Sequence, residues 1–282
     1  VPARIQPTAR QVRLGAELRK LRDAAGLTSR QAAALLGTNP AQMSQIEAGN
    51  AGVSGERVRK LGVQYASADM ELVDALVEMA TDRTRGWWEE YRDVLPPVFQ
   101  DLAELEHHAT FMRVVGTVHV PGLLQTQEYA RAVFAYVVPE LPVDELDLRV
   151  RHRMRRKLVL SERTVPYEAV IHESVLRTRV ADRRVAVAQL DELLSQSERP
   201  NVSLRVIPFG VDGFAGAGAM MLYAGGRVPA LDTVQRDAPY GSVFLDASAQ
   251  LLAMRTLFRR VESAALPPAK SRDYIHRLTK EL

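Results

Sequence analysis

The feature that most constrains this chain is a glycine turn between two short helical segments in residues 28–49. Gly37 follows two leucines, and a helix that ends there needs a residue that tolerates a positive φ, as glycine does because it lacks a Cβ. Asn39 then suits the N-cap of a second helix, and Pro40 suits its first position because its φ is already helical. The pattern predicts two short helices joined by a sharp turn.

The two predicted helices have apolar and polar faces. Ala33 is small where steeply crossing helices would approach closely, and the other apolar positions are Leu36, Met43 and Ile46. The remaining arc of the second helix carries hydrogen-bonding side chains, namely Gln42, Ser44 and Gln45. Such a pair of helices forms a helix-turn-helix, whose second helix enters the major groove of DNA. The alternative is a helical hairpin whose polar face is only solvated.

Basic side chains are concentrated at the same end of the chain. Residues 1–66 contain ten Lys and Arg against four Asp and Glu, a net charge of +6; the whole chain carries +3, so residues 67–282 sum to −3. The ten basic residues are Arg4, Arg10, Arg13, Arg19, Lys20, Arg22, Arg30, Arg57, Arg59 and Lys60. Because bound Lys and Arg release counterions from phosphates, this excess favours a nucleic-acid partner.

Residues 8–66 resemble the phage-repressor-like helix-turn-helix regulators known as the XRE family. The resemblance rests on a dense set of elements at the family's spacings: Leu18-Arg19-x-x-Arg22, Gly26-Leu27-Thr28, Gln31-Ala32-Ala33, Leu36-Gly37 and Ser44-Gln45-Ile46-Glu47-x-Gly49. It implies a regulator that binds a double-stranded DNA operator. Arg22 and Glu47 match positions that often form a salt bridge between the first and third helices, so we expect a scaffolding role, with an additional contact from Arg22 to a phosphate left open.

The expected DNA contacts divide between the two helices. The N-terminus of the helix that starts near Thr28 directs backbone N–H groups and a positive dipole end outward, which suits a phosphate. Phosphate contacts are therefore expected from Thr28, Ser29, Arg30, Gln31 and Thr38. The resemblance places the second helix toward the major groove, with base contacts from Asn39, Pro40, Ala41, Gln42, Ser44 and Gln45. The two glutamines can pair with an adenine edge, and Ala41 can touch a thymine methyl.

A chain of 282 residues is too long for this module alone and fits more than one domain. We expect an all-α helix-turn-helix domain at 1–80 with its core at 8–66, a hinge and helical connector at 81–110, and a mixed α/β (α+β) domain at 111–282. Ser54 and Asp69 are expected to cap two further helices. The polar run at 80–86 marks the hinge, and Trp87-Trp88 after it are expected to pack between domains or subunits.

Strands and helices alternate in the second domain. The predicted strands are Phe111–Val120, Tyr167–His172, Val202–Pro208, Ala219–Tyr223 and Ala230–Gln235. The predicted helices lie near 125–137, 143–161, 182–197, 246–264 and 268–280. The strand–helix–strand unit from 167 to 208 has the length of a crossover connection, so we expect its two strands to be parallel.

Residues 87–278 resemble a domain of unknown function (DUF5753-like) that follows repressor-like helix-turn-helix modules in many actinobacterial regulators. The elements that carry the resemblance are Trp87-Trp88, Val120-Pro121-Gly122-Leu123-Leu124-Gln125-Thr126, Tyr129-Ala130-Arg131, Arg151-x-Arg153 and Asn201-Val202-Ser203-Leu204-Arg205-Val206-Ile207-Pro208-Phe209. Such regulators are frequently encoded beside a small partner protein. The resemblance implies a C-terminal half that senses an effector, dimerises or binds a partner.

No catalytic residue, metal site or cofactor is predicted in the second domain. His172-Glu173 ends a predicted strand but lacks a second histidine at metal-ligand spacing, and Glu173 suits a helix cap. On a helix, His107 and His108 would diverge by about 100°, so they do not share an ion easily. The glycine-rich stretch at 208–220 lacks the ending of a P-loop and is predicted to be a mobile loop that could cover a pocket.

One predicted helix is rich in basic residues, at Arg149, Arg151, Arg153, Arg155, Arg156 and Lys157. Its apolar stripe is expected at Leu146, Val150, Met154 and Leu158. The basic residues could neutralise acidic neighbours, bind an anionic ligand or touch the flanks of the DNA site. In the absence of other evidence, we expect these side chains to form a solvent-exposed face of the helix.

Composition limits the remaining possibilities. No apolar run approaches the roughly 20 residues that span a bilayer, and the first residues lack an apolar leader segment. The absence of cysteine excludes disulfides, thiolate metal ligands and cysteine nucleophiles. We therefore expect a cytoplasmic, nucleoid-associated protein without a membrane partner.

The expected function is sequence-specific transcriptional regulation by a homodimer, whose C-terminal domain senses a small-molecule effector or binds a partner protein. The alternative is the DNA-bound half of a two-protein, toxin–antitoxin-like pair with a small co-encoded partner. An enzyme with a DNA-binding tether is less favoured.

Overall fold

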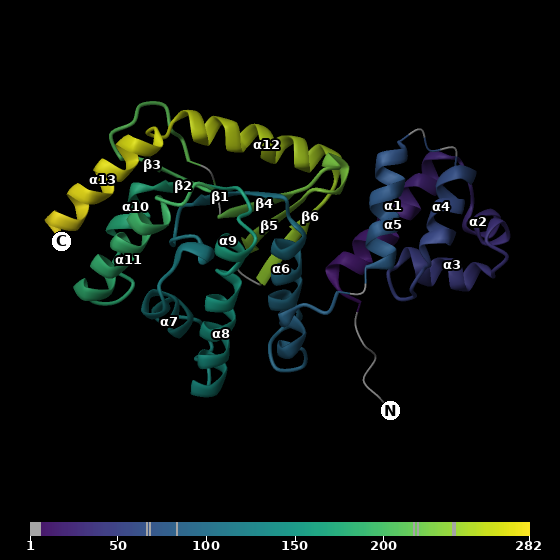
Figure 1. Cartoon of the computed structure of the whole chain (residues 1–282), viewed down its shortest axis with the longest axis horizontal. Coiled ribbons are helices and arrows are strands. Elements are labelled where there is room, and N and C mark those ends of the chain that lie inside the picture. Colours follow the sequence, from purple (N-terminus) through teal and green to yellow (C-terminus); the bar gives the residue numbers. More distant parts are fainter. Residues whose placement is uncertain are drawn as a thin grey trace. The chain divides into compact units, whose positions relative to one another are not determined.

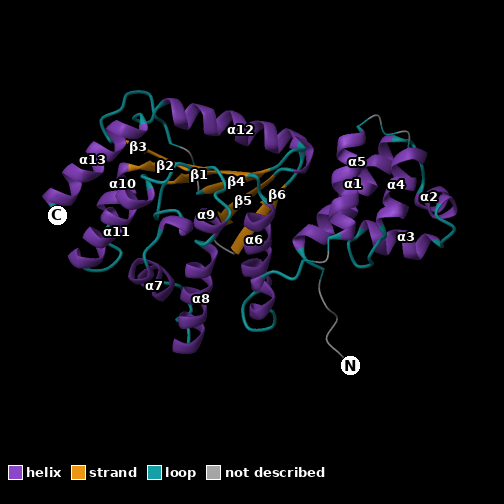
Figure 2. Cartoon of the chain, in the orientation of Figure 1, coloured by secondary structure: helices purple, strands orange, loops and turns teal. Residues whose placement is uncertain are grey.

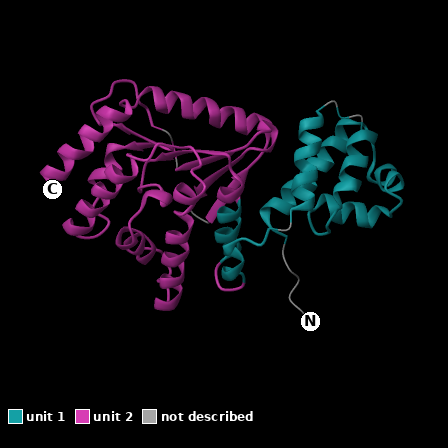
Figure 3. Cartoon of the chain, viewed as in Figure 1, with its two compact units in different colours: residues 1–92, 96–104 teal, residues 93–95, 105–282 magenta. Residues whose placement is uncertain are grey.

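The computed structural model describes residues 7–65, 67, 69–82, 84–216, 218, 220–238 and 241–282. The chain divides into two compact units, residues 1–92 with 96–104 and residues 93–95 with 105–282 (Figure 3). The first unit is helical, whereas the second combines a six-stranded sheet with helices (Figure 2). The expected order of an α domain and an α/β domain is therefore confirmed. The first unit also takes in much of the connector that the sequence placed at 81–110.

Seven helical elements are described in the N-terminal part of the chain (Figure 1): α1 (Ala9–Ala24), α2 (Ser29–Leu35), α3 (Pro40–Glu47), α4 (Gly55–Gln64), α5 (Met70–Thr81), the 3₁₀ helix η1 (Trp87–Tyr91) and α6 (Pro97–His108). A side-chain oxygen of the N-cap residue accepts a backbone N–H at the start of α1 to α5, as helix termini require. The caps expected at Asn39, Ser54 and Asp69 are confirmed. Arg4 and Arg83 lie outside the described residues.

The core of the helical unit is built around α3. The apolar positions expected on the buried side, Leu36, Met43 and Ile46, are all buried, and Gly37 adopts a φ of 63° at the turn. Ala33 is buried as well, but the sequence missed a tighter approach at Gly15 of α1. A Cβ at that position would lie 2.5 Å from the backbone oxygen of Ile46, so only glycine lets α1 and α3 pack this closely.

The second unit contains one sheet in the strand order β3-β2-β1-β4-β5-β6. Its strands are β1 (Phe111–Gly116), β2 (Tyr167–His172), β3 (Val202–Ile207), β4 (Met221–Gly225), β5 (Thr233–Ala238) and β6 (Gly241–Leu245). The first three strands are parallel, which confirms the crossover expected between β2 and β3, and the pairs from β1 through β6 by way of β4 and β5 are antiparallel. The sheet is therefore mixed.

Helices cover both faces of this sheet (Figure 1). They are η2 (Gly122–Leu124), α7 (Gln127–Ala135), α8 (Val143–Arg156), α9 (Val159–Glu162), α10 (Glu173–Arg177), α11 (Arg183–Gln196), η3 (Pro229–Leu231), α12 (Ser248–Ser263) and α13 (Pro268–Glu281). On one face, apolar residues of five strands pack against Leu251, Phe258 and Val261 of α12. Because side chains alternate along a strand, the intervening residues, including Tyr167, face the opposite layer with α8 and α11.

Several predicted boundaries differ from the structure for identifiable reasons. β1 ends at Gly116 instead of Val120, because the Val120 N–H donates to the Tyr129 hydroxyl and not to a neighbouring strand. Residues 229–231 form a 3₁₀ turn that begins at Pro229, so β5 starts only at Thr233. The partly exposed strand β6 was not predicted. Ala219, the expected start of the fourth strand, lies outside the described residues.

The helix expected at 143–161 is divided. α8 ends at Arg156 and α9 begins at Val159, so a single apolar stripe does not continue across the break. Val150 is buried as expected, but Leu158 is 43% exposed, and its assignment to the stripe is wrong.

The Pro121–Thr126 segment is held by hydrogen bonds within itself and to neighbouring helices. The Gln125 amide donates to the carbonyl of Val120, and the Thr126 hydroxyl caps α7. Gln189 of α11 donates to the carbonyl of Leu124 and accepts the N–H of Thr126. These hydrogen bonds join this short segment to α7 and α11.

Candidate DNA-binding interface

The start of α2 is built as the sequence predicts for a phosphate contact. The Thr28 hydroxyl accepts the N–H of Gln31, and Gln31 Oε1 accepts the N–H of Thr28, which completes a capping box. Thr28, Arg30 and Gln31 are exposed. The positive end of the helix dipole and the exposed guanidinium of Arg30 therefore lie on the same short turn.

Two of the expected phosphate contacts are modified by local bonds. Gln31 Oε1 is committed to the cap, so only its amide nitrogen is left as a donor for DNA. Ser29 Oγ is buried and makes no hydrogen bond to the part of the chain that the structure describes. Ser29 can therefore reach a phosphate only through its backbone N–H. Thr38, in the turn before α3, is half-buried.

α3 presents the expected base-contacting face. Pro40, Ala41, Ser44 and Gln45 are exposed and Gln42 is half-buried, whereas Met43 and Ile46 between them are buried in the core. Asn39 is exposed, but its Oδ1 accepts the N–H of Gln42 at 2.7 Å. Its amide nitrogen is therefore the group that can donate a hydrogen bond to DNA. The helix is therefore held by its apolar side while its polar side chains point away from the core.

Arg22 of α1 and Glu47 of α3 form the ion pair expected of them. Arg22 Nε and Nη2 donate to the two carboxylate oxygens of Glu47, at 2.6 Å and 3.0 Å, and Nη1 donates to the carbonyl of Leu27. The Glu47 hydrogen bond raises the pKa of Arg22 against the opposing effect of burial. All three nitrogens are engaged and the residue is buried, which supports the scaffolding role expected of Arg22.

Only part of the net positive charge of the N-terminal residues lies on the surface. Arg13 is buried against Glu17, and Arg22 is buried against Glu47, so these two charges do not contribute an exposed field. Exposed basic side chains remain at Arg19, Lys20, Arg30, Arg57, Arg59 and Lys60. Of these, Arg19, Lys20 and Arg59 have carboxylate partners. Arg30 has none among the described residues, which leaves its charge available to a phosphate.

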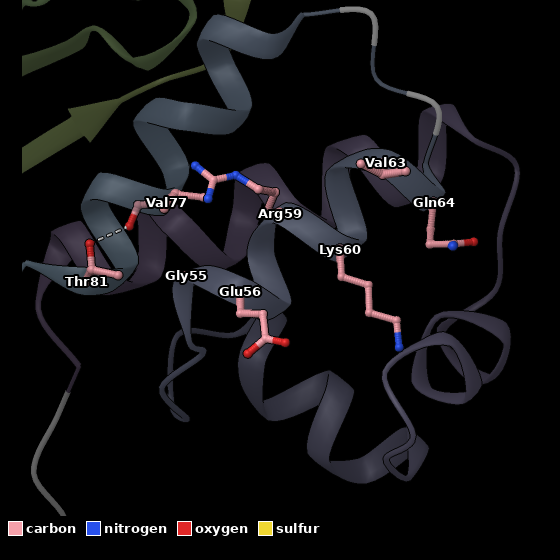
Figure 4. A pocket seen from close by; sticks show the side chains of 8 residues that line it. All are labelled: Gly55, Glu56, Arg59, Lys60, Val63, Gln64, Val77 and Thr81. Atoms are coloured by element: carbon pink, nitrogen blue, oxygen red, sulfur yellow. Dashed lines mark hydrogen bonds between the residues drawn. The ribbon is translucent and has the colours of Figure 1, made fainter.

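A groove of about 520 Å³ lies between α4 and α5 of the same unit (Figure 4). Its lining residues are Gly55, Glu56, Arg59, Lys60, Val63, Gln64, Val77 and Thr81. Arg59 pairs with Asp74, and the Thr81 hydroxyl donates to the carbonyl of Val77. None of the expected DNA contacts lines this groove, so it is separate from the predicted interface.

The tryptophan pair belongs to η1 in the first unit. Trp88 is buried, and its carbonyl accepts a hydrogen bond from Gln100 of α6. Trp87 packs edge-to-face against both Trp88 and Tyr91. The pair therefore belongs to an aromatic cluster next to α6.

The residues weighed as metal ligands have other roles. His172 caps α10 by accepting the N–H of Ser174, so the cap expected of Glu173 is supplied by its neighbour. The Glu173 carboxylate instead accepts the N–H of Phe209 and pairs with Arg177. His107 and His108 pack edge-to-face with ring centres 5.0 Å apart. Within the described residues, no three His, Asp or Glu side chains are placed to share a metal ion.

The glycine-rich loop after β3 is attached to the sheet by its aromatic and backbone groups. Phe209 and Phe214 pack against the His172 ring, with ring centres 5.1 Å and 5.6 Å away. The Thr117 hydroxyl donates to the carbonyl of Gly218. These contacts place the described part of the loop beside the ends of β1 and β2. Ala217 and Ala219 lie outside the described residues.

The basic residues of α8 are not a simple solvated face. Arg156 is buried and donates through Nε and Nη2 to the Glu106 carboxylate, and Lys157 donates to Glu192 and to the carbonyl of Gln125. Arg149 pairs with Glu145 one turn earlier. Neutralisation of acidic neighbours is thus the role of these three. Arg151 is exposed, and Arg153 is half-buried.

Comparison with family models finds two matches. A model described as a helix-turn-helix domain matches residues 13–76, and the model of a domain of unknown function (DUF5753) matches residues 99–277. Both resemblances seen in the sequence are therefore confirmed at this level, while the finer XRE assignment stays a prediction. No curated protein and no solved structure matches the chain. Among the described residues, no helix is both long and apolar enough to cross a membrane.

Proposed function

The chain belongs to the family defined by the domain of unknown function (DUF5753), and because a helix-turn-helix domain precedes that domain, we propose that it is a sequence-specific transcriptional regulator. The helix-turn-helix match supports a DNA-binding regulator. In this proposal, α3 reads base edges in the major groove and the start of α2 fixes the unit on a phosphate. The location that follows is the nucleoid in the cytoplasm.

One observation carries the proposal. α3 is anchored on one side by Met43 and Ile46 and offers Ala41, Ser44 and Gln45 on the other, directly after a capped helix start with exposed Arg30. Amide and hydroxyl groups on a rigid helix suit base edges, and an exposed guanidinium at a helix N-terminus suits a phosphate. A merely solvated hairpin has no need for both at once.

We assign the active form to a homodimer. Two copies would read half-sites about 34–36 Å apart, one turn of the DNA helix. The α7–α8 connection supports a protein contact, since Tyr136 is 91% exposed and Val138 is 90% exposed beside exposed Val143. In this proposal a second copy covers these residues, and a small co-encoded partner protein is the alternative occupant.

The C-terminal domain, in this proposal, adjusts DNA binding in response to a small-molecule effector or a partner. The proposal includes no enzymatic activity and no cofactor. Turnover of a substrate by the purified chain would contradict this part without affecting the DNA-binding part.

The decisive experiment is genome-wide DNA binding by the intact protein, with the region upstream of its own gene inspected first. We expect enrichment at a small number of sites that share a two-fold related sequence. If no site in the genome is enriched, the proposal is overturned. Light scattering of the wild type and of Val138→Asp tests the dimer separately: a dimeric wild type and a monomeric variant are expected, and a monomeric wild type would contradict the homodimer.

A further inference from the structure

Arg153 of α8 differs from the other buried arginines of this chain. Its Nη1 donates to Gln125 Oε1 at 2.6 Å, and its guanidinium lies 4.7 Å from the centre of the Phe134 ring. Its Nε is buried and has no hydrogen-bond partner among the described residues. Among the described residues, the one acceptor bonded to this largely enclosed cation is a neutral amide, which is energetically costly, so the site is incompletely satisfied.

The donors of Arg153 that have no partner among the described residues, Nε and Nη2, lie on one edge of the guanidinium. Arg22 uses Nε and Nη2 to bind both carboxylate oxygens of Glu47, and Arg156 uses the same two nitrogens to bind Glu106. In Arg153 this edge forms no ion pair with the described part of the chain. A guanidinium edge of this kind matches a carboxylate or a phosphate with two parallel hydrogen bonds.

The two carboxylates that act electrostatically on Arg153 do not fill this role. Glu106 is already bound by Arg156, and Asp237 of β5 accepts hydrogen bonds from Gln235 and Ser242. Both favour the charged form of Arg153 electrostatically, without a hydrogen bond to it. Burial, with a smaller effect of neighbouring Arg156, lowers the pKa of Arg153 to about 9, so the guanidinium is still charged at neutral pH.

The surroundings hold the guanidinium in place. The backbone of Gly122 approaches it closely, since a Cβ there would lie 3.0 Å from Arg153 Nη1. Gln125, which binds Nη1, is itself held by the carbonyl of Val120. Arg153 as a whole is half-buried, so part of the side chain meets solvent, whereas its Nε is enclosed. His119 lies within electrostatic range, and burial, together with the charge of Arg153, lowers its pKa.

We propose that Arg153 is the centre of an anion-binding site that takes the carboxylate or phosphate group of a small molecule through its Nε and Nη2. Gln125 and the Gly122 backbone position the guanidinium, and the Phe134 ring packs on its face. The site stands on this geometry alone. Its role as the effector site of a regulator rests on the proposed function.

The test is isothermal titration calorimetry of the full chain with sodium phosphate in one arm and sodium succinate in the other, at constant ionic strength set with sodium chloride. We expect saturable binding of at least one of the two, which identifies the preferred oxyanion. Arg153→Met should abolish this binding. Arg153→Lys, which keeps the charge but loses the two-donor edge, should weaken it about tenfold or more. Arg151→Gln, two residues away and exposed, is the matched control and should bind like the wild type.

The proposal is overturned if neither anion binds the wild type, or if Arg153→Met binds as tightly as the wild type. The Lys variant keeps the test valid if the Met variant fails to fold, because unchanged affinity in Arg153→Lys would also contradict the two-donor edge. None of these measurements requires DNA. A failure of DNA binding therefore leaves the anion site standing, and a failure of anion binding leaves the regulator proposal standing.

Discussion

The two units of this protein each bury an arginine–glutamate pair, but the pairs are built differently. In the helical unit, Arg22 also donates to the carbonyl of Leu27 and to Asp23, so Glu47 is one of three acceptors. In the α/β unit, Glu106 is the only described partner of Arg156. Arg22 thus has alternatives if its carboxylate is lost, whereas Arg156 has none among the described residues. The difference shows that similar ion pairs can carry unequal shares of stability.

The units also direct their charges differently. The helical unit buries two arginines and keeps Arg30 exposed at a helix start, where DNA can meet it. On α8 of the second unit, Arg156 and Arg153 turn toward the protein, and one of them lacks a carboxylate. Outward charge favours a large polyanion such as DNA. Five variants and one control test this comparison, from the largest expected effect to the smallest.

Glu106→Gln should cause the largest loss of stability. The change leaves Arg156 buried with a neutral acceptor, and removing one partner of a buried ion pair costs about 3–5 kcal/mol. Urea unfolding monitored by circular dichroism measures the free energy of unfolding. Glu168→Gln, which breaks the half-exposed pair with Arg113, is the control and should cost about 1 kcal/mol or less. Equal losses in both variants would show that the Glu106 pair is not special.

Glu47→Gln should destabilise the helical unit by less, about 2 kcal/mol, because Arg22 keeps the carbonyl of Leu27 and the Asp23 carboxylate. The same unfolding experiment compares it directly with Glu106→Gln. A loss as large as that of the Glu106 variant would contradict the idea that the extra acceptors protect Arg22.

Gln45→Ala and Arg30→Ala should separate base reading from phosphate binding. We expect the Gln45 variant to lose about 1–3 kcal/mol of discrimination between the operator and a scrambled duplex. The Arg30 variant should weaken binding to both duplexes alike and reduce the salt dependence. Fluorescence anisotropy at several salt concentrations measures both. Unchanged operator selectivity in the Gln45 variant would contradict a base contact at this position.

Glu173→Gln should destabilise the fold at neutral pH, and this effect should disappear at acid pH. Burial alone would raise the pKa of Glu173, but hydrogen bonds from Tyr274, the Phe209 N–H and Arg177 outweigh it and hold the pKa below the usual 4.5. The carboxylate therefore stabilises the fold fully above pH 4.5, and this contribution is lost as the pH falls through the folded-state pKa. The stability difference between wild type and variant should shrink on acidification. A difference that is constant with pH would contradict this.

Local patterns in the sequence predicted the helical unit well because its determinants are local. Asn39, Pro40 and Gly37 act on neighbouring backbone groups, so their types alone predict where α3 begins and how the turn is made. The pairing of β2 with β3 was predictable for the same reason, since a crossover depends on connection length. By contrast, Gly15 matters only because α3, some thirty residues later, packs against it.

Residue order by itself therefore determined the helix-turn-helix, its caps, its polar face and the mixed α/β character of the second domain. The tertiary structure alone decided which arginines of α8 are buried, that Glu106 neutralises Arg156, and that Arg153 is left with a neutral acceptor. The physical reason is that a helical period assigns a residue to a face, whereas burial of a charge depends on which distant carboxylates the fold brings to that face. Arg153 and Arg156 are three residues apart on one helix, and only the fold distinguishes them.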